Sequence, residues 1–372
     1  MRVALVHDYL KEYGGAERVL EALHDVYPNA TVFTSVYLPN YLGPHKERFE
    51  KWKIKTSFLQ HVPFNAKLIS PFRLVSGLAF GAFDFSGYDV IISSATGAYF
   101  PNSLNKKKAK LICYCHTPPR YLYGYATARE WKKNRVFNAL GELANHFLRM
   151  VDFEASKNVD EYIANSVEVA SRIAKFYKRE AVVIYPPVKI SNFKSQISNS
   201  KKRNYYLAGG RLARPKNIDL IVKTCTELKL PLKVFGKSFA GYGEELKNIA
   251  GSSVEFLGEV TDQEKYELMN GAKAFIFAST DEDFGIVPVE AMAQGTPVIA
   301  YRSGGVKETV VEGKSGVFFD ELSVASLKQA LKKLDDAKIQ TSECIRQAEK
   351  FSEERFKKEI DRFVIKTVES SS

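Results

Sequence analysis

The 372-residue chain carries 54 Lys and Arg residues against 43 Asp and Glu residues, a formal net charge of +11. Its length predicts two domains, and its 45% hydrophobic and 26% charged residues are typical of a globular protein. Without an apolar run of about 18 residues we expect no transmembrane helix, and the N-terminal "MRVALVHDYL" predicts a first strand instead of a signal peptide.

The positive charge is concentrated in the first half of the chain. Residues 1–185 contain 25 Lys and Arg residues and 17 Asp and Glu residues, an excess of 8, whereas the remainder has an excess of 3. Such asymmetry indicates a face that meets phosphate, in nucleic acid or in anionic lipid. No nucleic-acid-binding motif accompanies it, so we expect no nucleic acid partner.

The four cysteines are scattered along the chain, and none has metal-ligand spacing. Cys113 and Cys115 alternate along the apparent strand "KLICYCH", and Cys225 and Cys344 stand alone. This pattern predicts buried, reduced thiols and favours a reducing cytosol over an oxidising compartment.

Short apolar or β-branched runs alternate with longer amphipathic runs throughout. In chain order, the first half predicts strands at "RVALVH", "ATVFTS", "DVIISSA", "KLICYCH", "EYIANS" and "VVIYPP". The second half predicts them at "NYYLAGG", "LKVFGK", "VEFLGEV", "AFIFAST", "PVIAYR" and "GVFFD". Helical patterns such as "AERVLEALHDVY" lie between several of these strands. The alternation predicts an α/β protein whose parallel sheets are covered on both faces.

A polar segment, "PPVKISNFKSQISNSKKRN", separates the two series of strands and predicts a domain boundary. We therefore expect a first doubly wound domain over residues 1–188, a linker over 189–203 and a second doubly wound domain over 204–350. Two such domains are expected to face each other across a deep cleft at the carboxyl ends of their strands. The final helical pattern, within 351–372, either completes the second domain or returns to the first.

Three features of the first half are candidates for ligand binding. Gly14 and Gly15 follow the first strand and precede a helix, where glycine lets the backbone approach a ligand, although such a pair is often only a turn. The pair departs from G-x-G-x-x-G, which disfavours a dehydrogenase. His116 lies at the end of a strand. It either makes a structural hydrogen bond or faces the cleft. Residues 45–80 mix Lys and Arg with Phe, Trp and Leu, which fits equally a membrane interface or a core helix with a solvated basic face.

In the second half, "LAGGRLARPKNIDLIV" places two cations around a turn that precedes a helix. Arg211 and Lys216 are five residues apart, so both can reach one diphosphate and stabilise a leaving group without a metal. A solvated basic turn explains the same residues, and Arg214 shows that surplus charge is tolerated there.

The stretch "STDEDFGIVPVEAMAQGTPVIAYRSGG" places a loop at a helix N-terminus. The pattern predicts a helix from about Val287 to Gly295, with the N–H groups of Ile286 and Val287 available to an anion. Glu290 either caps its own helix or binds a ligand, and Glu282 is either a solvated acid or part of a site. The triplet "DED" is also compatible with a cluster of carboxylates that binds a metal ion, although acidic triplets are common in loops.

These motifs carry a family resemblance. "EDFGIVPVE" and its frame "ST-E-FG---VEAMA-GTPVIA---GG--E-V" resemble the E-x7-E element of retaining family 4 glycosyltransferases of GT-B architecture, and "GRLARPK" resembles that family's G-R-x-x-x-x-K element. "VALVHDYL---GGAERVL" and "YCHTPPRYLY" are similar to segments of bacterial O-antigen and capsule mannosyltransferases. The resemblance is strongest at residues 3–20, 112–123, 205–217 and 279–309.

The resemblance implies a role for each candidate residue. The first domain would be the acceptor side and the second would bind the nucleotide sugar. Glu290 would bind the ribose hydroxyls and Glu282 would lie beside the donor sugar. The remaining implied donor contacts are Gly14, Gly15, Arg211, Lys216, Lys237, Val260, Phe284, Gly285, Ile286 and Val287, with Lys237 and Val260 near the nucleobase. His116 would contact a sugar hydroxyl, and the implied catalytic group is Glu282, Arg211, Lys216 and His116.

The implied reaction is transfer of a hexose with retention, with mannose from GDP-mannose the expected donor, to a glycan or lipid-linked acceptor in cell-surface polysaccharide synthesis. It needs no cofactor and no metal, and implies a cytoplasmic enzyme that contacts the inner face of the cell membrane peripherally. Three alternatives remain open at this point: a UDP-sugar donor, a nucleotide-sugar epimerase or sugar phosphorylase, and a non-catalytic sugar-nucleotide-binding scaffold.

Overall fold

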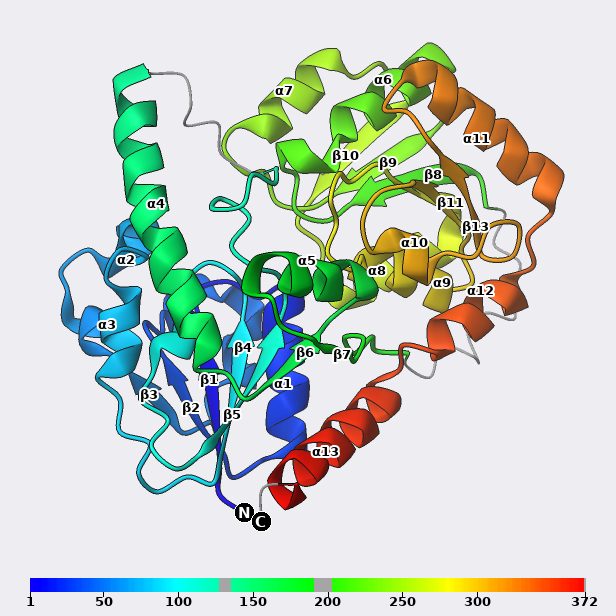
Figure 1. The fold of residues 1–372 in the computed structure, drawn as a ribbon. Helices are drawn as coiled ribbons and strands as arrows, with labels where there is room; N and C mark the ends of the chain where they lie inside the picture. The colour runs from blue at the N-terminus through cyan, green and yellow to red at the C-terminus, as the bar shows by residue number, and fades with distance from the viewer. Residues whose placement is uncertain (127–134, 191–202, 371–372) are drawn as a thin grey trace. The chain divides into compact units, whose positions relative to one another are not determined.

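The computed structural model of the protein describes residues 1–126, 135–190 and 203–370, which divide into two compact units. The first unit contains the chain up to Tyr125, the segment from helix α4 (Arg135–Lys157) to Pro187, and the chain from Glu354 onward. The second contains Val188–Glu353. Figure 1 labels the elements of both units. The predicted linker over 189–203 lies mostly outside the described residues.

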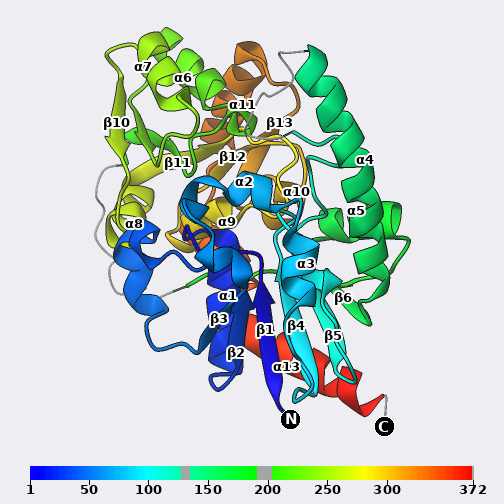
Figure 2. The same cartoon turned by 90° about the vertical axis from the view of Figure 1, so that its left-hand side faces the viewer.

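The first unit is built on a seven-stranded parallel sheet in the order β3-β2-β1-β4-β5-β6-β7, with β1 near its middle (Figure 2). Its strands are β1 (Val3–His7), β2 (Thr31–Thr34), β3 (Ile54–Thr56), β4 (Val90–Ala95), β5 (Lys110–Cys115), β6 (Glu161–Ala164) and β7 (Val182–Val183). Its helices are α1 (Gly15–Val26), α2 (Ile69–Phe72), α3 (Ser76–Gly81), α4, α5 (Val167–Tyr177) and α13 (Glu353–Glu369).

Both faces of this sheet are covered, which explains why its central strands are apolar without alternation. Every residue of β1 and of β4 is buried. One core cluster contains Ala4 and Ile91, and another contains Leu5 and Ile92, the side chains of successive residues pointing to opposite faces. The second cluster includes Phe356, a residue of α13. Helix α13 passes behind the strands in the view of Figure 2. The C-terminal helix therefore packs on the first unit.

The second unit has a six-stranded parallel sheet in the order β10-β9-β8-β11-β12-β13. Its strands are β8 (Tyr205–Gly209), β9 (Leu232–Phe235), β10 (Val254–Gly258), β11 (Ala272–Phe277), β12 (Val298–Tyr301) and β13 (Gly316–Phe319). Its helices are α6 (Ile218–Glu227), α7 (Tyr242–Ile249), α8 (Asp262–Gly271), α9 (Ile286–Ala293), α10 (Val306–Thr309), α11 (Val324–Ala337) and α12 (Thr341–Glu349). Because β8 is adjacent to both β9 and β11, the sheet reverses its winding there, and loops at such a point commonly hold the ligand.

The predicted α/β class with two Rossmann-like parallel sheets is confirmed. Each strand expected from the sequence appears in the structure, and β3 is an additional strand that sequence patterns missed. The four cysteines are buried and free, as predicted. Within the described residues, none of the helices combines the length and apolar character needed to cross a membrane.

The basic and aromatic region over residues 45–80 divides between core and surface. Phe49, Phe72 and Phe80 are buried, with at most 6% of their surface exposed. Phe64 and Leu78, in contrast, are 78% and 73% exposed. Neither of the two interpretations of this region therefore describes all of it.

Candidate active site

Helix α9 begins at Ile286, one residue before the predicted start, and ends at Ala293. Its N-cap residue is Gly285, whose φ of +92° is in the left-handed region that favours glycine. Pro288 lies in the first turn, where its missing N–H leaves no helical hydrogen bond unmade. The sequence "FGIVP" thus forms a tight turn into a helix whose first N–H groups have no partner within the helix.

Lys216 and Glu282 form an ion pair, although 66 residues separate them in the sequence. Their side chains are 28% and 18% exposed, so the pair is only partly open to solvent. Ser279 Oγ donates a further hydrogen bond to Glu282 Oε2 over 2.7 Å. Two of the predicted catalytic residues are therefore in direct contact.

The loops that carry this ion pair follow the neighbouring strands β8 and β11 and are joined by backbone and side-chain bonds. The N–H of Thr280 donates to the carbonyl of Pro215 over 2.8 Å, and Asn217 Nδ2 donates to the carbonyl of Ala278 over 2.9 Å. Adjacent parallel strands place both loops at the same edge of the sheet, where these bonds fix the cation relative to the carboxylate.

A third loop packs against Glu282 and accounts for the Gly-Gly pair at the end of the motif. The N–H of Gly305 donates to the carbonyl of Glu282 over 2.8 Å. A Cβ at Gly304 would lie 2.2 Å from that carbonyl oxygen, and φ at Gly304 is +68°. Only glycine lets the two backbones approach this closely, so the pair holds the Glu282 loop in place.

Glu290 is buried, with 2% of its side chain exposed, and pairs with a cation that sequence analysis did not identify. Its Oε1 lies 2.8 Å from Lys265 Nζ, and the same amine lies 3.1 Å from Asp262 Oδ1. Lys265 is 9% exposed and Asp262 is 34% exposed. The carboxylate expected at the ribose is thus one end of a buried Glu-Lys-Asp cluster that reaches the surface at Asp262.

The other cations in this region are more exposed than Lys216. The Arg211 guanidinium lies 5.9 Å from the centre of the Phe239 ring, on the same loop as Lys216. Lys237 forms an exposed ion pair with Glu259 over 3.3 Å. Arg214 pairs with Glu245 over 2.6 Å on the exposed surface, as expected for a surplus charge.

The residues expected to bind the donor through their backbone are buried or half-buried. The side chain of Phe284 is buried and packs against the ring of Phe351, with centroids 5.3 Å apart. Ile286 and Val287 are half-buried at the first turn of α9, and Val260 is half-buried after β10. At Phe284, therefore, only the backbone is available to a ligand.

Gly14, Gly15 and His116 belong to the first unit. Gly14 is the N-cap residue of α1, and its N–H donates to Glu17 Oε2 over 2.8 Å. His116 follows β5, is 9% exposed, and its Nε2 lies 2.9 Å from Ser94 Oγ. Burial, assisted by the neighbouring His7, lowers the pKa of His116 to about 3, so the imidazole is neutral at physiological pH.

Asp8 is a further polar group at this edge of the first sheet, and sequence analysis did not single it out. It is fully buried, and its Oδ2 accepts hydrogen bonds from the N–H groups of Ala98 and Tyr99 over 3.1 and 3.0 Å and from the hydroxyl of Thr96. Burial raises the pKa of its carboxyl group. Asp8 therefore fixes the loop that follows β4.

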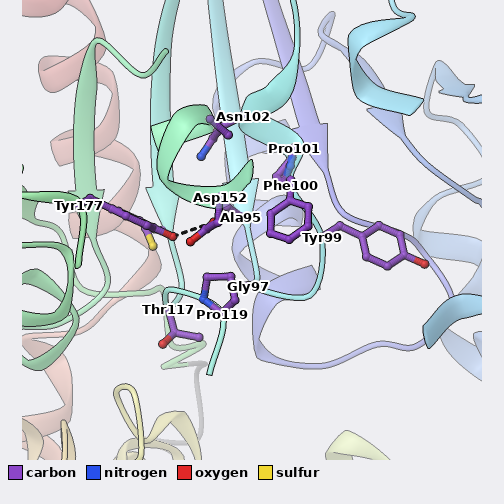
Figure 3. A pocket seen from close by; sticks show the side chains of 12 residues that line it. Ala95, Gly97, Tyr99, Phe100, Pro101, Asn102, Thr117, Pro119, Asp152 and Tyr177 are labelled. Atoms are coloured by element: carbon purple, nitrogen blue, oxygen red, sulfur yellow. Dashed lines mark hydrogen bonds between the residues drawn. The ribbon is translucent and has the colours of Figure 1, made fainter. Parts of the chain in front are cut away.

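A small pocket of the first unit is lined by Gly97, Thr117, Asp152 and Tyr177, among others. Figure 3 shows the hydrogen bond between Tyr177 and Asp152 in its wall. Asp152 accepts from the hydroxyl of Tyr177 over 3.1 Å and from that of Tyr123 over 2.7 Å. Burial, only partly offset by these bonds, raises the pKa of Asp152 to about 7.

The raised pKa of Asp152 predicts a pH-dependent stability. Between pH 4 and pH 7 the folded protein holds a proton that the unfolded chain releases, so the free energy of unfolding falls as the pH rises. Between pH 5 and pH 8 this group contributes a fall of about 3 kcal/mol, which Asp152→Asn should remove. Urea unfolding of both proteins at the two pH values measures the difference. Glu154→Gln, on the exposed side of the same helix, is the control, and equal pH dependence in the wild type and Asp152→Asn would contradict the prediction.

Two family descriptions match the chain in succession. Residues 13–192 match "Glycosyltransferase Family 4", and residues 189–351 match "Glycosyl transferases group 1". Together the two matches include every strand of both sheets except β1, and every predicted site residue.

Comparison with individual proteins agrees with these matches. The α-1,3/1,6-mannosyltransferase ALG2 of Mus musculus is 26% identical over 319 residues, covering 76% of this chain and 74% of its own. The structure is similar to Anabaena Alr3699/HepE in complex with UDP, with a TM-score of 0.70, 19% identity and coverage of 98% of this chain and 100% of HepE. It is also similar to sucrose-phosphate synthase from Thermosynechococcus elongatus, with a TM-score of 0.74, 18% identity and full coverage of both chains. The chain belongs to the family 4 glycosyltransferases, enzymes with the GT-B fold.

Proposed function

We propose that this glycosyltransferase moves mannose from GDP-mannose to a hydroxyl of a glycan or lipid-linked acceptor, with retention of configuration. The observation that carries the proposal is the Lys216–Glu282 ion pair, on loops bonded to each other at the edge where α9 begins. Similarity to proteins named as mannosyltransferases supports the choice of sugar.

The leaving group of such a reaction is a nucleoside diphosphate, whose negative charge increases as the sugar–oxygen bond breaks. Lys216 and Arg211 supply cations on one loop, and the first N–H groups of α9, at Ile286 and Val287, supply donors on the next. Fixed donors and cations of this kind stabilise the developing charge without reorganising. Glu282 holds the Lys216 amine in place in the free protein, so the cation is already ordered when the diphosphate arrives.

Asp262 supports guanine as the base. Its carboxylate is 34% exposed, held at 3.1 Å by the buried Lys265, and lies in the cluster that contains Glu290. A carboxylate only accepts hydrogen bonds, and guanine offers it two adjacent donors, N1–H and the 2-amino group, whereas uracil offers one. Asp262 and Glu290 contact the same Lys265 amine, so if Glu290 binds the ribose we expect Asp262 to reach the base.

A panel of nucleotide sugars without acceptor tests the proposal, through the slow hydrolysis of the correct donor. We expect GDP release from GDP-mannose to exceed nucleotide release from GDP-glucose, UDP-glucose and UDP-galactose. Asp262→Asn should narrow the preference for GDP over UDP in calorimetric binding. Faster turnover of a UDP sugar would overturn the choice of base. A UDP sugar is the second candidate donor, because the similar structure of HepE contains UDP.

The same assay separates the other classes. A transferase should release nucleoside diphosphate faster when an acceptor is added, whereas an epimerase would return the nucleotide still attached to an altered sugar. A scaffold would bind the donor without turnover over a broad range of acceptors. A sugar phosphorylase would require inorganic phosphate.

An exposed apolar face of the first unit supports peripheral contact with an anionic membrane. On α4, the side chains of Leu143, Phe147, Met150 and Val151 follow helical spacing and are 42–57% exposed, whereas the polar Asn145 and Asp152 are buried. A Cβ at Gly77 of α3 would lie 3.7 Å from Val151 Cγ1, so the two helices are adjacent. Leu74, Val75 and Leu78 of that segment are exposed as well, and we name these seven residues the α3–α4 face.

The charge of the chain segment that contains α3 favours a membrane over a second protein chain. From Lys51 to Phe83 the sequence contains five Lys and Arg residues and no Asp or Glu, and Lys67 beside α2 is exposed. Apolar side chains that enter the lipid, with cations level with lipid phosphate, are typical of interfacial binding. In this proposal the enzyme works in the cytoplasm, on the inner face of the cell membrane.

Co-sedimentation with liposomes tests the contact. The protein should pellet with vesicles that contain phosphatidylglycerol at low salt and should pellet less at high salt. Phe147→Glu with Leu78→Glu should abolish pelleting, whereas Ile365→Glu, a similarly exposed apolar residue on α13, should not. Equal pelleting of all three proteins, or salt-insensitive self-association without vesicles, would contradict the membrane proposal.

A further inference from the structure

A continuous series of buried polar side chains connects Glu17 of α1 to His116. His7 Nε2 lies 3.5 Å from Glu17 Oε1, His7 Nδ1 lies 3.1 Å from Ser94 Oγ, and Ser94 Oγ lies 2.9 Å from His116 Nε2. All four side chains are buried, with exposures from 0% to 9%. We name these four residues the His7–His116 relay.

The sheet brings the relay together. His7 ends β1 and is in register with Ser94 of β4, and the N–H of His116 donates to the carbonyl of Ala95 over 2.9 Å. Glu17 is fixed from the other side, because its Oε2 accepts the N–H of Gly14. Its Oε1 is thereby turned to His7 Nε2 across 3.5 Å, and no shorter hydrogen bond within the described residues competes for this nitrogen.

The carboxylate determines which way the hydrogen bonds run. Glu17 can only accept, and a neutral histidine has one N–H and one bare nitrogen. His7 therefore places its proton on Nε2, towards Glu17, and its bare Nδ1 accepts from the hydroxyl of Ser94. The Ser94 oxygen then accepts from His116 Nε2–H, which leaves Nδ1 of His116 as the bare nitrogen.

We propose that Glu17 is a positioning residue that sets the tautomer of His116 through His7 and Ser94, so that His116 Nδ1 accepts a hydrogen bond from a hydroxyl of the transferred sugar. The role of the sugar hydroxyl rests on the proposed function. The tautomer does not, because it follows from the relay in the free protein. The low pKa of His116 agrees with a neutral imidazole in this position.

Nitrogen NMR of protein labelled at histidine tests the tautomer directly, because protonated and bare ring nitrogens have well-separated chemical shifts. In the wild type we expect His116 to be protonated on Nε2. In Glu17→Gln the new side-chain oxygen can keep the Gly14 bond while its amide donates to His7. Each hydrogen bond of the relay then reverses, and His116 should be protonated on Nδ1.

Two further variants keep the test decisive. Ser94→Ala removes the connecting hydroxyl with little loss of volume and should leave His116 as a mixture of tautomers. Glu21→Gln changes a carboxylate of the same helix that binds Arg48 and Tyr13 outside the relay, and should leave the tautomer unchanged. A wild-type His116 protonated on Nδ1, or the same tautomer in Glu17→Gln as in the wild type, would overturn the proposal. A doubly protonated His7 would also overturn it, since the hydrogen bonds would then run the other way.

Activity tests whether the tautomer matters to the reaction. Glu17→Gln and His116→Ala should each lower kcat/KM for the donor about 10-fold or more, and the double variant should be no worse than His116→Ala, because Glu17 acts through His116. Additive losses would show that Glu17 acts by another route. If no sugar nucleotide is turned over, the proposed function fails, while the NMR result still decides the relay.

Discussion

Glu290→Ala is expected to lower the free energy of unfolding by about 3 kcal/mol. The substitution leaves the amine of Lys265, which is 9% exposed, without its nearest carboxylate at 2.8 Å. Removal of one partner from a buried ion pair costs about 3–5 kcal/mol because the remaining charge stays buried. Asp262 remains 3.1 Å from the amine, which favours the lower end of this range. Urea unfolding, followed by circular dichroism, measures the change.

Two controls separate this mechanism from a general loss of packing. Glu290→Gln with Lys265→Met removes both charges, and should recover most of the stability that Glu290→Ala loses. Glu259→Ala removes one partner of the exposed pair with Lys237 and should cost at most about 1 kcal/mol. The prediction fails if Glu290→Ala unfolds at the same urea concentration as the wild type.

The expected loss of stability changes how a loss of activity in Glu290→Ala should be interpreted. If Glu290 only bound the ribose, its substitution would weaken donor binding and leave the stability of the fold unchanged. The buried pair with Lys265 means that stability and donor binding change together. Glu290→Gln, which keeps the shape and a hydrogen-bond acceptor, is the better probe of the ribose contact, provided that its unfolding curve is recorded as well.

The sequence predicts the sheets well because their signal is local. Each central strand contains a run of apolar residues, as in "VALVH" of β1, and the Phe-Gly-x-x-Pro pattern predicts the start of α9 within one residue. Strand β3 was missed because Ile54–Thr56 has only three residues, none of them buried, inside a basic and aromatic stretch.

The contacts that decide the chemistry are less visible in the sequence. The relay depends on β1 and β5 both lying beside β4, an order that the linear spacing of His7, Ser94 and His116 does not reveal. The pairing of Lys265 with Glu290 likewise depends on how α8 packs against α9. The predicted link between Lys216 and the E-x7-E motif came from family resemblance, and the structure supplies its physical basis in the adjacent strands β8 and β11.

Lys216→Ala is expected to lower kcat/KM for the nucleotide-sugar donor about 10-fold to 100-fold. A hydrogen bond between charged groups contributes about 1.5–3 kcal/mol, which corresponds to this range of rates. The effect on stability should be smaller, about 1 kcal/mol or less, because Lys216 is 28% exposed and Glu282 keeps the hydrogen bond from Ser279. Initial rates over a range of donor concentrations, with unfolding curves for the same proteins, measure both quantities.

The neighbouring cation provides the matched control for this prediction. Arg214 is two residues from Lys216, carries the same charge, and pairs with the exposed Glu245. If only overall positive charge attracted the donor, Arg214→Ala and Lys216→Ala would lower kcat/KM equally. Contact with the diphosphate requires that Lys216→Ala lose activity, that Arg214→Ala keep it, and that Lys216→Arg recover part of it. Unchanged kinetics in Lys216→Ala would make the Lys216–Glu282 pair a link between two loops and would remove the observation on which the proposed donor site depends.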